Sequence, residues 1–204
     1  MEKMLEWTWG DINNGDVGPG MFSWFHLLWL AIMVIACVVM GLTVARKHSP
    51  KADRITVSVF SVILIGCEVF KQLFWYAFYD YYRFEIFPFQ FCSVPIYVGL
   101  IAVFLPKGRV REALLCFLAT YSPVAGASVL FYPAKSVFSE MVFLNLHTMI
   151  WHGAMLLFGL YLWLSGAVKA EWRTAGKAAL VYVPLNFIAL ALNEASYAWG
   201  FAAG

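Results

Sequence analysis

The stretch LNLHTMIWHGAMLLFGLYLWL, Leu144–Leu164, has the length and apolar character of a membrane span but contains two histidines, His147 and His152. A helix of about twenty apolar residues crosses the hydrocarbon core of a bilayer. Similar runs recur through the 204 residues of the chain, of which 62% are hydrophobic and 13% charged. A soluble domain averages about 25% charged residues. The sequence therefore predicts an all-α, polytopic membrane protein.

Six apolar runs joined by short connections predict a single bundle of six transmembrane helices. The expected spans are 21–45, 55–79, 87–105, 112–132, 141–165 and 175–199. We expect two parts, a short extracytoplasmic segment over residues 1–20 and a transmembrane domain over residues 21–204. The first part is acidic and turn-rich and lacks the apolar core of a signal peptide, so the first span is expected to direct insertion.

Lysine and arginine residues are concentrated in every second connection. Ten of the fourteen lie there, namely Arg46, Lys47, Lys51, Arg54, Lys107, Arg109, Arg111, Lys169, Arg173 and Lys177. Loops enriched in positive residues face the cytoplasm. We therefore expect cytoplasmic connections at 46–54, 106–111 and 166–174, with both termini extracytoplasmic.

Polar residues also lie inside the predicted spans, where a charged side chain costs roughly 2.5–3.5 kcal/mol. In the second span, Glu68 is three residues before Lys71 and four before Gln72, so the three share a helix face and Glu68 can pair with Lys71. Given the expected orientation, polar residues of five spans fall in the outer halves of their helices: His26, Glu68, Lys71, Gln72, Gln90, Cys92, His147, His152, Asn193 and Glu194. This shared depth predicts a polar cavity open to the outer leaflet or the outer water. The alternative is a set of interhelical hydrogen bonds, each worth about 0.6 kcal/mol.

The two histidines of the fifth span are five residues apart and therefore point about 140° apart on an ideal helix. A pair four residues apart could bind one metal ion, but this pair cannot do so from one helix face. We expect no metal site and no cofactor. One histidine can face the cavity while the other faces a neighbouring helix, and Gly153 and Gly159 allow such a helix to approach closely.

Four motifs resemble those of the YwaF-like integral membrane proteins of bacteria: GMFSWFHLLWL, FPFQFCSVPIY, WHGAMLLFGLYLWL and LNFIALALNEASYAWG. The matching residues are His26, Pro88, Cys92, His152, Gly153, Asn186 and Asn193. Gln90 stands where that family has a histidine, Tyr197 is displaced, and His147 lies outside the pattern. The resemblance implies a location in the bacterial cytoplasmic membrane.

The YwaF-like proteins are in turn distantly similar to a eukaryotic six-span family that forms polyunsaturated ether phospholipids by acyl transfer. That family uses a cysteine at the start of its third span and a histidine in its fifth. The histidine corresponds to His152, whereas alignment on the proline places the cysteine nearer Phe89 than Cys92. The resemblance implies membrane lipid as the partner, a phospholipid as the candidate substrate, and no nucleic acid.

A thiol becomes a good nucleophile when a histidine base lies beside it, and the acyl intermediate then needs hydrogen-bond donors. We predict a membrane-embedded acyltransferase or lipid acyl hydrolase with Cys92 as nucleophile, His152 as base and Gln90 as donor. His152 rather than His147 is expected to face the cavity near Cys92. Residues expected to bind substrate or support the three are His26, Glu68, Lys71, Gln72, His147, Asn186 and Asn193. The alternative is a small-solute transporter or ligand-binding membrane protein without covalent chemistry, which intramembrane charges and prolines also suit.

Overall fold

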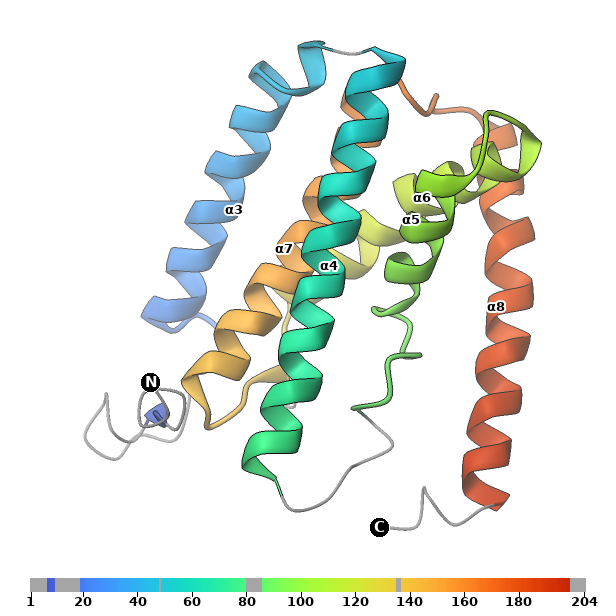
Figure 1. Cartoon of the computed structure of the whole chain (residues 1–204). Coiled ribbons are helices and arrows are strands. Elements are labelled where there is room, and N and C mark those ends of the chain that lie inside the picture. The colour runs from blue at the N-terminus through green and yellow to red at the C-terminus, as the bar shows by residue number, and fades with distance from the viewer. Residues whose placement is uncertain (1–6, 10–18, 48, 80–85, 135–136, 199–204) are drawn as a thin grey trace.

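The computed structural model describes residues 7–9, 19–47, 49–79, 86–134 and 137–198, and most of the predicted segment 1–20 lies outside them. The regular elements of the described chain are helices, and Thr8 and Met141 form an isolated antiparallel bridge. Its main elements are α3 (Trp24–Leu42), the short 3₁₀ helix η1 (Ala45–Lys47), α4 (Pro50–Phe78), α5 (Val94–Phe104), α6 (Arg109–Phe131), α7 (Val142–Leu164) and α8 (Trp172–Ala198), shown in Figure 1. The prediction of an all-α fold is confirmed.

Five of these helices are long and apolar enough to cross a membrane: α3 with η1, α4, α6, α7 and α8. The chain thus has the architecture of an integral membrane protein. Helix α5 has only 11 residues, a length of about 16 Å. It covers roughly half of a hydrocarbon core about 30 Å thick.

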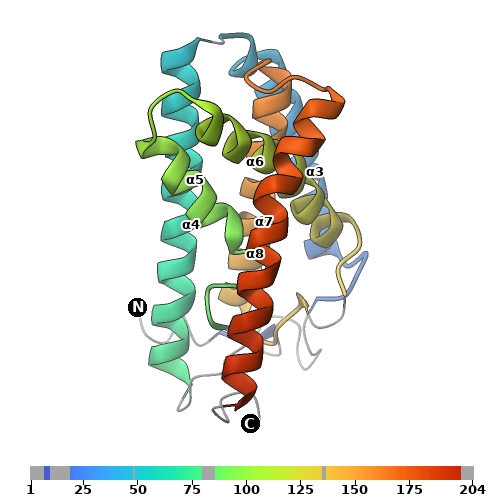
Figure 2. The same cartoon turned by 90° about the vertical axis from the view of Figure 1, so that its right-hand side faces the viewer.

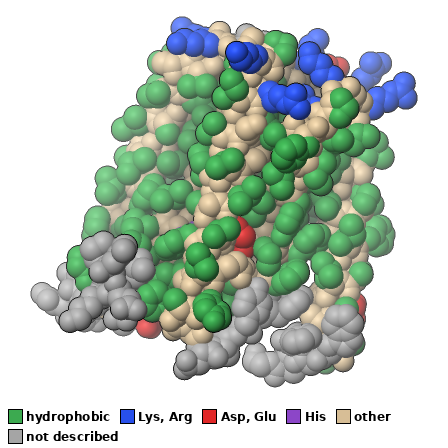
Figure 3. Space-filling model, viewed as in Figure 1, with side chains coloured by type: hydrophobic (Ala, Val, Ile, Leu, Met, Phe, Trp, Pro, Cys, Tyr) green, Lys and Arg blue, Asp and Glu red, His purple; other side chains and the backbone are tan. Residues whose placement is uncertain are grey.

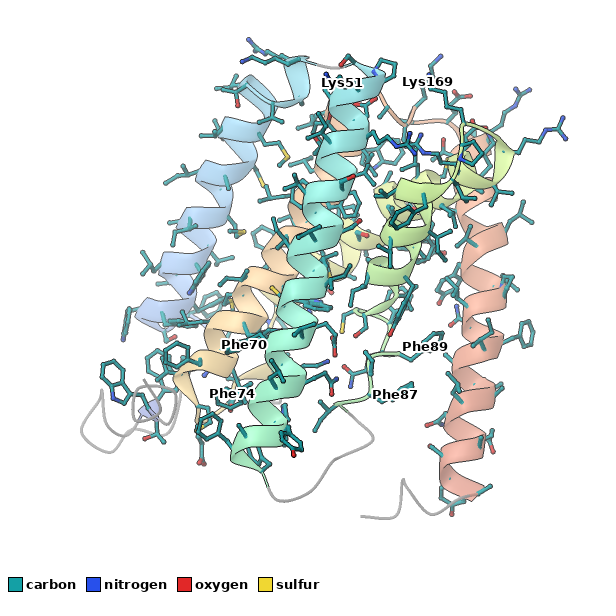
Figure 4. All side chains as sticks on the ribbon, in the orientation of Figure 1. Lys51, Phe70, Phe74, Phe87, Phe89 and Lys169 are labelled. Carbon is teal, nitrogen blue, oxygen red and sulfur yellow. The ribbon has the colours of Figure 1, made fainter. Side chains whose placement is uncertain are left out.

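The prediction of a third helix over 87–105 is wrong in its first part, because the helix begins at Val94 and the preceding residues form turns. Two prolines explain this start. Pro95 lacks a backbone N–H and is best accommodated in the first helical turn, where it lies in α5, and Pro88 disfavours helix at Phe87. We call residues 86–93 the entry segment. Figure 4 shows its labelled residues Phe87 and Phe89 on the chain leading into α5.

Helix α7 lies at the centre of the bundle and packs against α3, α4 and α6. Two glycines make the close contacts. A Cβ at Gly153 would lie 2.5 Å from the Met33 sulfur of α3, and one at Gly159 would overlap the Pro123 ring of α6. The prediction that these two glycines allow close helix approach is confirmed.

Helix α6 runs obliquely to α4 and α8 in both views (Figures 1 and 2) and contains a proline in its middle. Pro123 cannot donate to the carbonyl of Ala119, four residues earlier. That carbonyl accepts a hydrogen bond from Trp163 Nε1 of α7 instead. The interhelical bond both satisfies the freed carbonyl and joins α6 to α7.

Helix α8 packs chiefly against α6. Its buried residues are only Thr174, Ala178 and Ser196. The Tyr182 ring stacks on Tyr121 of α6 with centroids 4.5 Å apart. Most of α8 therefore faces away from the other helices, as Figure 2 shows from its side.

The Lys and Arg side chains gather at one end of the molecule in Figure 3, which we call the positive end. It comprises the ten residues Arg46, Lys47, Lys51, Arg54, Lys107, Arg109, Arg111, Lys169, Arg173 and Lys177. Two of them bind the last carbonyls of α5: Arg54 Nη2 lies 2.7 Å from Val103 O and Arg111 Nε lies 2.9 Å from Ala102 O. Of the Lys and Arg residues that the structure describes, Lys71 is the one outside this end.

Candidate functional site

A cavity of about 440 Å³ lies between α4, the entry segment, residues 137–139 and α7. We call it the polar chamber. Polar groups on its wall are Lys71, Gln90, Cys92, Ser93, Ser139, His147, Thr148 and His152, and aromatic residues on it are Trp75, Tyr79, Phe138 and Trp151. Five of the predicted site residues, Lys71, Gln90, Cys92, His147 and His152, thus meet in one cavity.

A second cavity, of about 570 Å³, lies between the entry segment, α6 and α7. We call it the side chamber. Its α6 wall is formed by Val124, Ala125, Ser128 and Val129. The two chambers share five lining residues: Gln90, Cys92, Val137, Thr148 and His152. A thiol, an imidazole and a carboxamide therefore lie where a polar space meets a largely apolar one.

The α4 side of the polar chamber is built on an ion pair. Lys71 Nζ lies 3.0 Å from Glu68 Oε1, which confirms the predicted pair. Gln72 Nε2 donates to the same Glu68 oxygen at 2.7 Å and to the Ile86 carbonyl at 2.8 Å. The three polar residues of α4 thus hold the start of the entry segment against the helix.

The entry segment is fixed by backbone hydrogen bonds on both sides of Cys92. The Gln90 carbonyl accepts from Ser93 N at 2.8 Å, and the Cys92 carbonyl accepts from Trp151 Nε1 of α7 at 3.3 Å. The Cys92 thiol lies 3.8 Å from the Gln90 side-chain oxygen. The first residue of α5, Val94, follows two positions later, so the positive end of that helix dipole lies beside Cys92.

His152 has a defined hydrogen bond at one ring nitrogen. Its Nδ1 lies 2.8 Å from the carbonyl of Thr148, one turn earlier on α7. An Nδ1–H that donates to this carbonyl leaves the Nε2 lone pair as the proton acceptor of the neutral ring. Gly126 of α6 lies directly against the His152 backbone, where a Cβ would overlap the carbonyl. The close approach of α6 therefore brings the side chamber to His152.

His147 also lines the polar chamber, although the prediction gave the cavity to His152 alone. Both histidines reach it because the α7 lining residues Leu144, His147, Thr148, Trp151 and His152 form one broad face, with His147 and His152 at its two edges. The His147 ring stacks on Phe70 with centroids 6.1 Å apart, and its Nε2 is buried with no hydrogen-bond partner within the described residues. Only His152 lines the side chamber as well.

Three predicted supporting residues lie away from both chambers, which corrects the prediction. His26 is fully buried between α3 and α6, where its Nε2 lies 2.7 Å from the Leu130 carbonyl and its Nδ1 accepts from Phe22 N at 3.0 Å. Asn186 donates to the Tyr182 carbonyl within α8, and Asn193 is exposed on the same helix. No residue of helix α8 lines either chamber; the helix packs on α6, and its Tyr182 contacts Phe91 of the entry segment.

The sequence-based prediction missed Ser93, Thr148 and Trp151 as wall residues. Thr148 and Trp151 lie one helical turn from His152 and His147 respectively, so the spacing on α7 could have identified them. Among the residues that the structure describes, no group of three or more His, Cys, Asp or Glu side chains could hold a metal ion.

Comparison with curated proteins and with solved structures found no match. The sequence profile of the TMEM164 family, in contrast, matches residues 21–198. This range includes every helix from α3 to α8 and all residues that line the two chambers. The resemblance to the YwaF-like proteins stays a prediction. The chain belongs to the TMEM164 family of membrane proteins.

Proposed function

We propose that this protein is a membrane-embedded acyltransferase or lipid acyl hydrolase that works through Cys92 and His152. One observation supports it most directly: Cys92, His152 and Gln90 line both the polar chamber and the side chamber. A lipid ester has a polar headgroup, an apolar chain and a carbonyl between them. A lipid bound across the two chambers would place its ester carbonyl at the shared residues.

The proposed reaction has two steps that share one base. In the first, His152 Nε2 accepts the Cys92 thiol proton while the sulfur attacks the ester carbonyl carbon. The tetrahedral intermediate then collapses, the carbon–oxygen ester bond breaks, and His152 returns the proton to the leaving alkoxide. A thioester on Cys92 and a free alcohol result. In the second step, water or another alcohol gives its proton to His152 and attacks the thioester carbonyl carbon. The carbon–sulfur bond breaks, a fatty acid or a new ester leaves, and His152 returns the proton to the Cys92 sulfur.

The negative charge of the intermediate would be stabilised by groups around Cys92. The Gln90 carboxamide lies 3.8 Å from the sulfur, and turning its amide by 180° would present two N–H donors in place of the oxygen. The N-terminus of α5 contributes a partial positive charge. The Lys71 ammonium on the polar-chamber wall, paired with Glu68, adds a further positive group. Removing a single oxyanion donor typically reduces kcat by roughly 100- to 1,000-fold.

The test is the release or transfer of a labelled acyl chain from phospholipid by purified protein in nanodiscs. We expect Cys92→Ala to abolish turnover, and His152→Gln to reduce it by roughly 100- to 10,000-fold. Cys37→Ala is the matched control, because Cys37 is a half-buried cysteine on α3 outside both chambers. Wild-type turnover by Cys92→Ala protein would overturn the proposal. Solute flux that survives this substitution would support the transporter instead.

A further inference from the structure

We infer that the α6 wall of the side chamber, centred on Ala125, sets the length of acyl chain that the protein accepts from the bilayer. This inference rests on the proposed function and extends it to the substrate's apolar part. Val124, Ala125, Ser128 and Val129 form the wall, and Cys92 and His152 line the same chamber. Residues at these spacings share one side of a helix.

The size and lining of the side chamber suit a hydrocarbon chain. Its volume of about 570 Å³ exceeds the 440 Å³ of the polar chamber and falls within the range of roughly 300–1,000 Å³ that is usual for small-molecule sites. Apart from the residues shared with the polar chamber, Ser128 is its one polar lining residue; the others are Phe91, Val124, Ala125 and Val129. Among the described residues, no charged side chain lines it.

The α6 wall is open towards the bilayer. Val124 is 68% exposed and Ser128 is exposed as well. Helix α8 covers α6 one turn earlier, at the stacked pair Tyr121 and Tyr182, and does not reach the side chamber. Lipid tails would therefore surround this opening in a membrane. An acyl chain could enter sideways without leaving the hydrocarbon.

Ala125 occupies the position where added volume would matter most. The next residue, Gly126, brings the α6 backbone against the backbone of His152 and Leu156. The small Ala125 side chain consequently lies beside the contact that brings α6 to His152, which lines the side chamber together with Cys92. A leucine there would fill space beside the reacting carbonyl. A long acyl chain needs this space, whereas a short chain fits without it.

The experiment compares two phospholipids that differ only in carrying octanoyl or palmitoyl chains, and measures the ratio of palmitoyl to octanoyl turnover. We expect Ala125→Leu to lower this ratio by about tenfold or more. Ala127→Leu is the control, because Ala127 is a half-buried residue of the same helix outside both chambers. Its ratio should equal that of the wild type. Val129→Ala widens the chamber without overpacking and should raise the ratio, so the inference stays testable if Ala125→Leu does not fold.

Thermal stabilisation of Cys92→Ala protein by the same lipids separates binding from chemistry. We expect the palmitoyl lipid to stabilise it more than the octanoyl lipid, and Ala125→Leu to remove that preference. If Ala125→Leu and Val129→Ala both fold and both keep the wild-type preference between palmitoyl and octanoyl lipid, the inference is overturned while the proposed function stays intact. A different result would overturn the proposed function alone: wild-type protein shows no turnover, but Cys92→Ala protein still prefers the palmitoyl lipid and Ala125→Leu removes that preference.

Discussion

The buried His26 and the half-buried His147 differ in what their ring nitrogens bind. His26 is hydrogen-bonded at both nitrogens, to Leu130 O and Phe22 N. His147 lines the polar chamber, and its Nε2 is buried without a hydrogen-bond partner among the described residues. A buried polar atom without a partner costs stability, whereas removing a bonded one leaves its partner unsatisfied at about 1–3 kcal/mol.

We therefore expect His26→Phe to lower the free energy of unfolding by about 2–4 kcal/mol, since two backbone groups lose a partner. His147→Phe should change it by less than about 1 kcal/mol but should weaken substrate binding. Thermal unfolding in detergent and turnover measurements provide the comparison. Equal destabilisation by the two substitutions would show that His147 is a structural residue like His26.

The Glu68 and Lys71 pair of α4 allows a second test at this scale. Both side chains are largely buried and lie 3.0 Å apart. Removing one partner of a buried pair leaves an uncompensated charge and costs about 3–5 kcal/mol. Glu68→Gln and Lys71→Met should each destabilise the fold strongly, and the double variant should be more stable than the worse single variant. A double-mutant cycle with no coupling energy would contradict a paired role.

At the scale of elements, the contact between α6 and α7 depends on glycine at position 126. A Cβ there would overlap backbone atoms of His152 and Leu156, which cannot move like a side chain. Gly66, in α4, has no atom within 4 Å of the position that a Cβ would take. The two glycines therefore form a matched pair of helical positions.

Gly126→Ala should destabilise the protein by about 1–3 kcal/mol through overpacking and should also reduce turnover by displacing His152. Gly66→Ala should stabilise it by about 0.5–1 kcal/mol, because alanine favours helix over glycine. Unfolding midpoints of the two variants decide the matter. A Gly126→Ala protein as stable and active as wild type would mean that α6 does not fix His152.

Hydropathy predicted five long helices to within a few residues of their ends, because each is an uninterrupted apolar run of spanning length. Hydropathy missed the start of α5, because the entry segment is as apolar as the predicted spans. Hydropathy does not register that Pro88 and Pro95 disfavour a helix through this segment. The shared depth of polar residues correctly brought Lys71, Cys92 and His152 together. Depth does not determine which side of a helix faces a cavity, and Asn193 is exposed on α8 and lines neither chamber.

At the scale of the whole molecule, the positive end predicts the orientation in the membrane. Gly20 lies at the opposite end of α3, and Lys107 lies at the positive end between α5 and α6. On a background without native cysteines, Gly20→Cys should react with an impermeant thiol reagent in intact cells. Lys107→Cys should react only after permeabilisation. The reverse pattern would place both chambers in the cytoplasmic half of the bilayer.

The account depends most on a covalent acyl intermediate at the junction of the two chambers. Mass spectrometry of the purified protein after incubation with a palmitoyl phospholipid should detect the mass of one palmitoyl group, located on the peptide that contains Cys92 and removed by hydroxylamine as expected for a thioester. The adduct should be absent from Cys92→Ala protein and unaffected in Cys37→Ala protein. Turnover without any adduct on Cys92, or an adduct that persists in Cys92→Ala protein, would contradict the account.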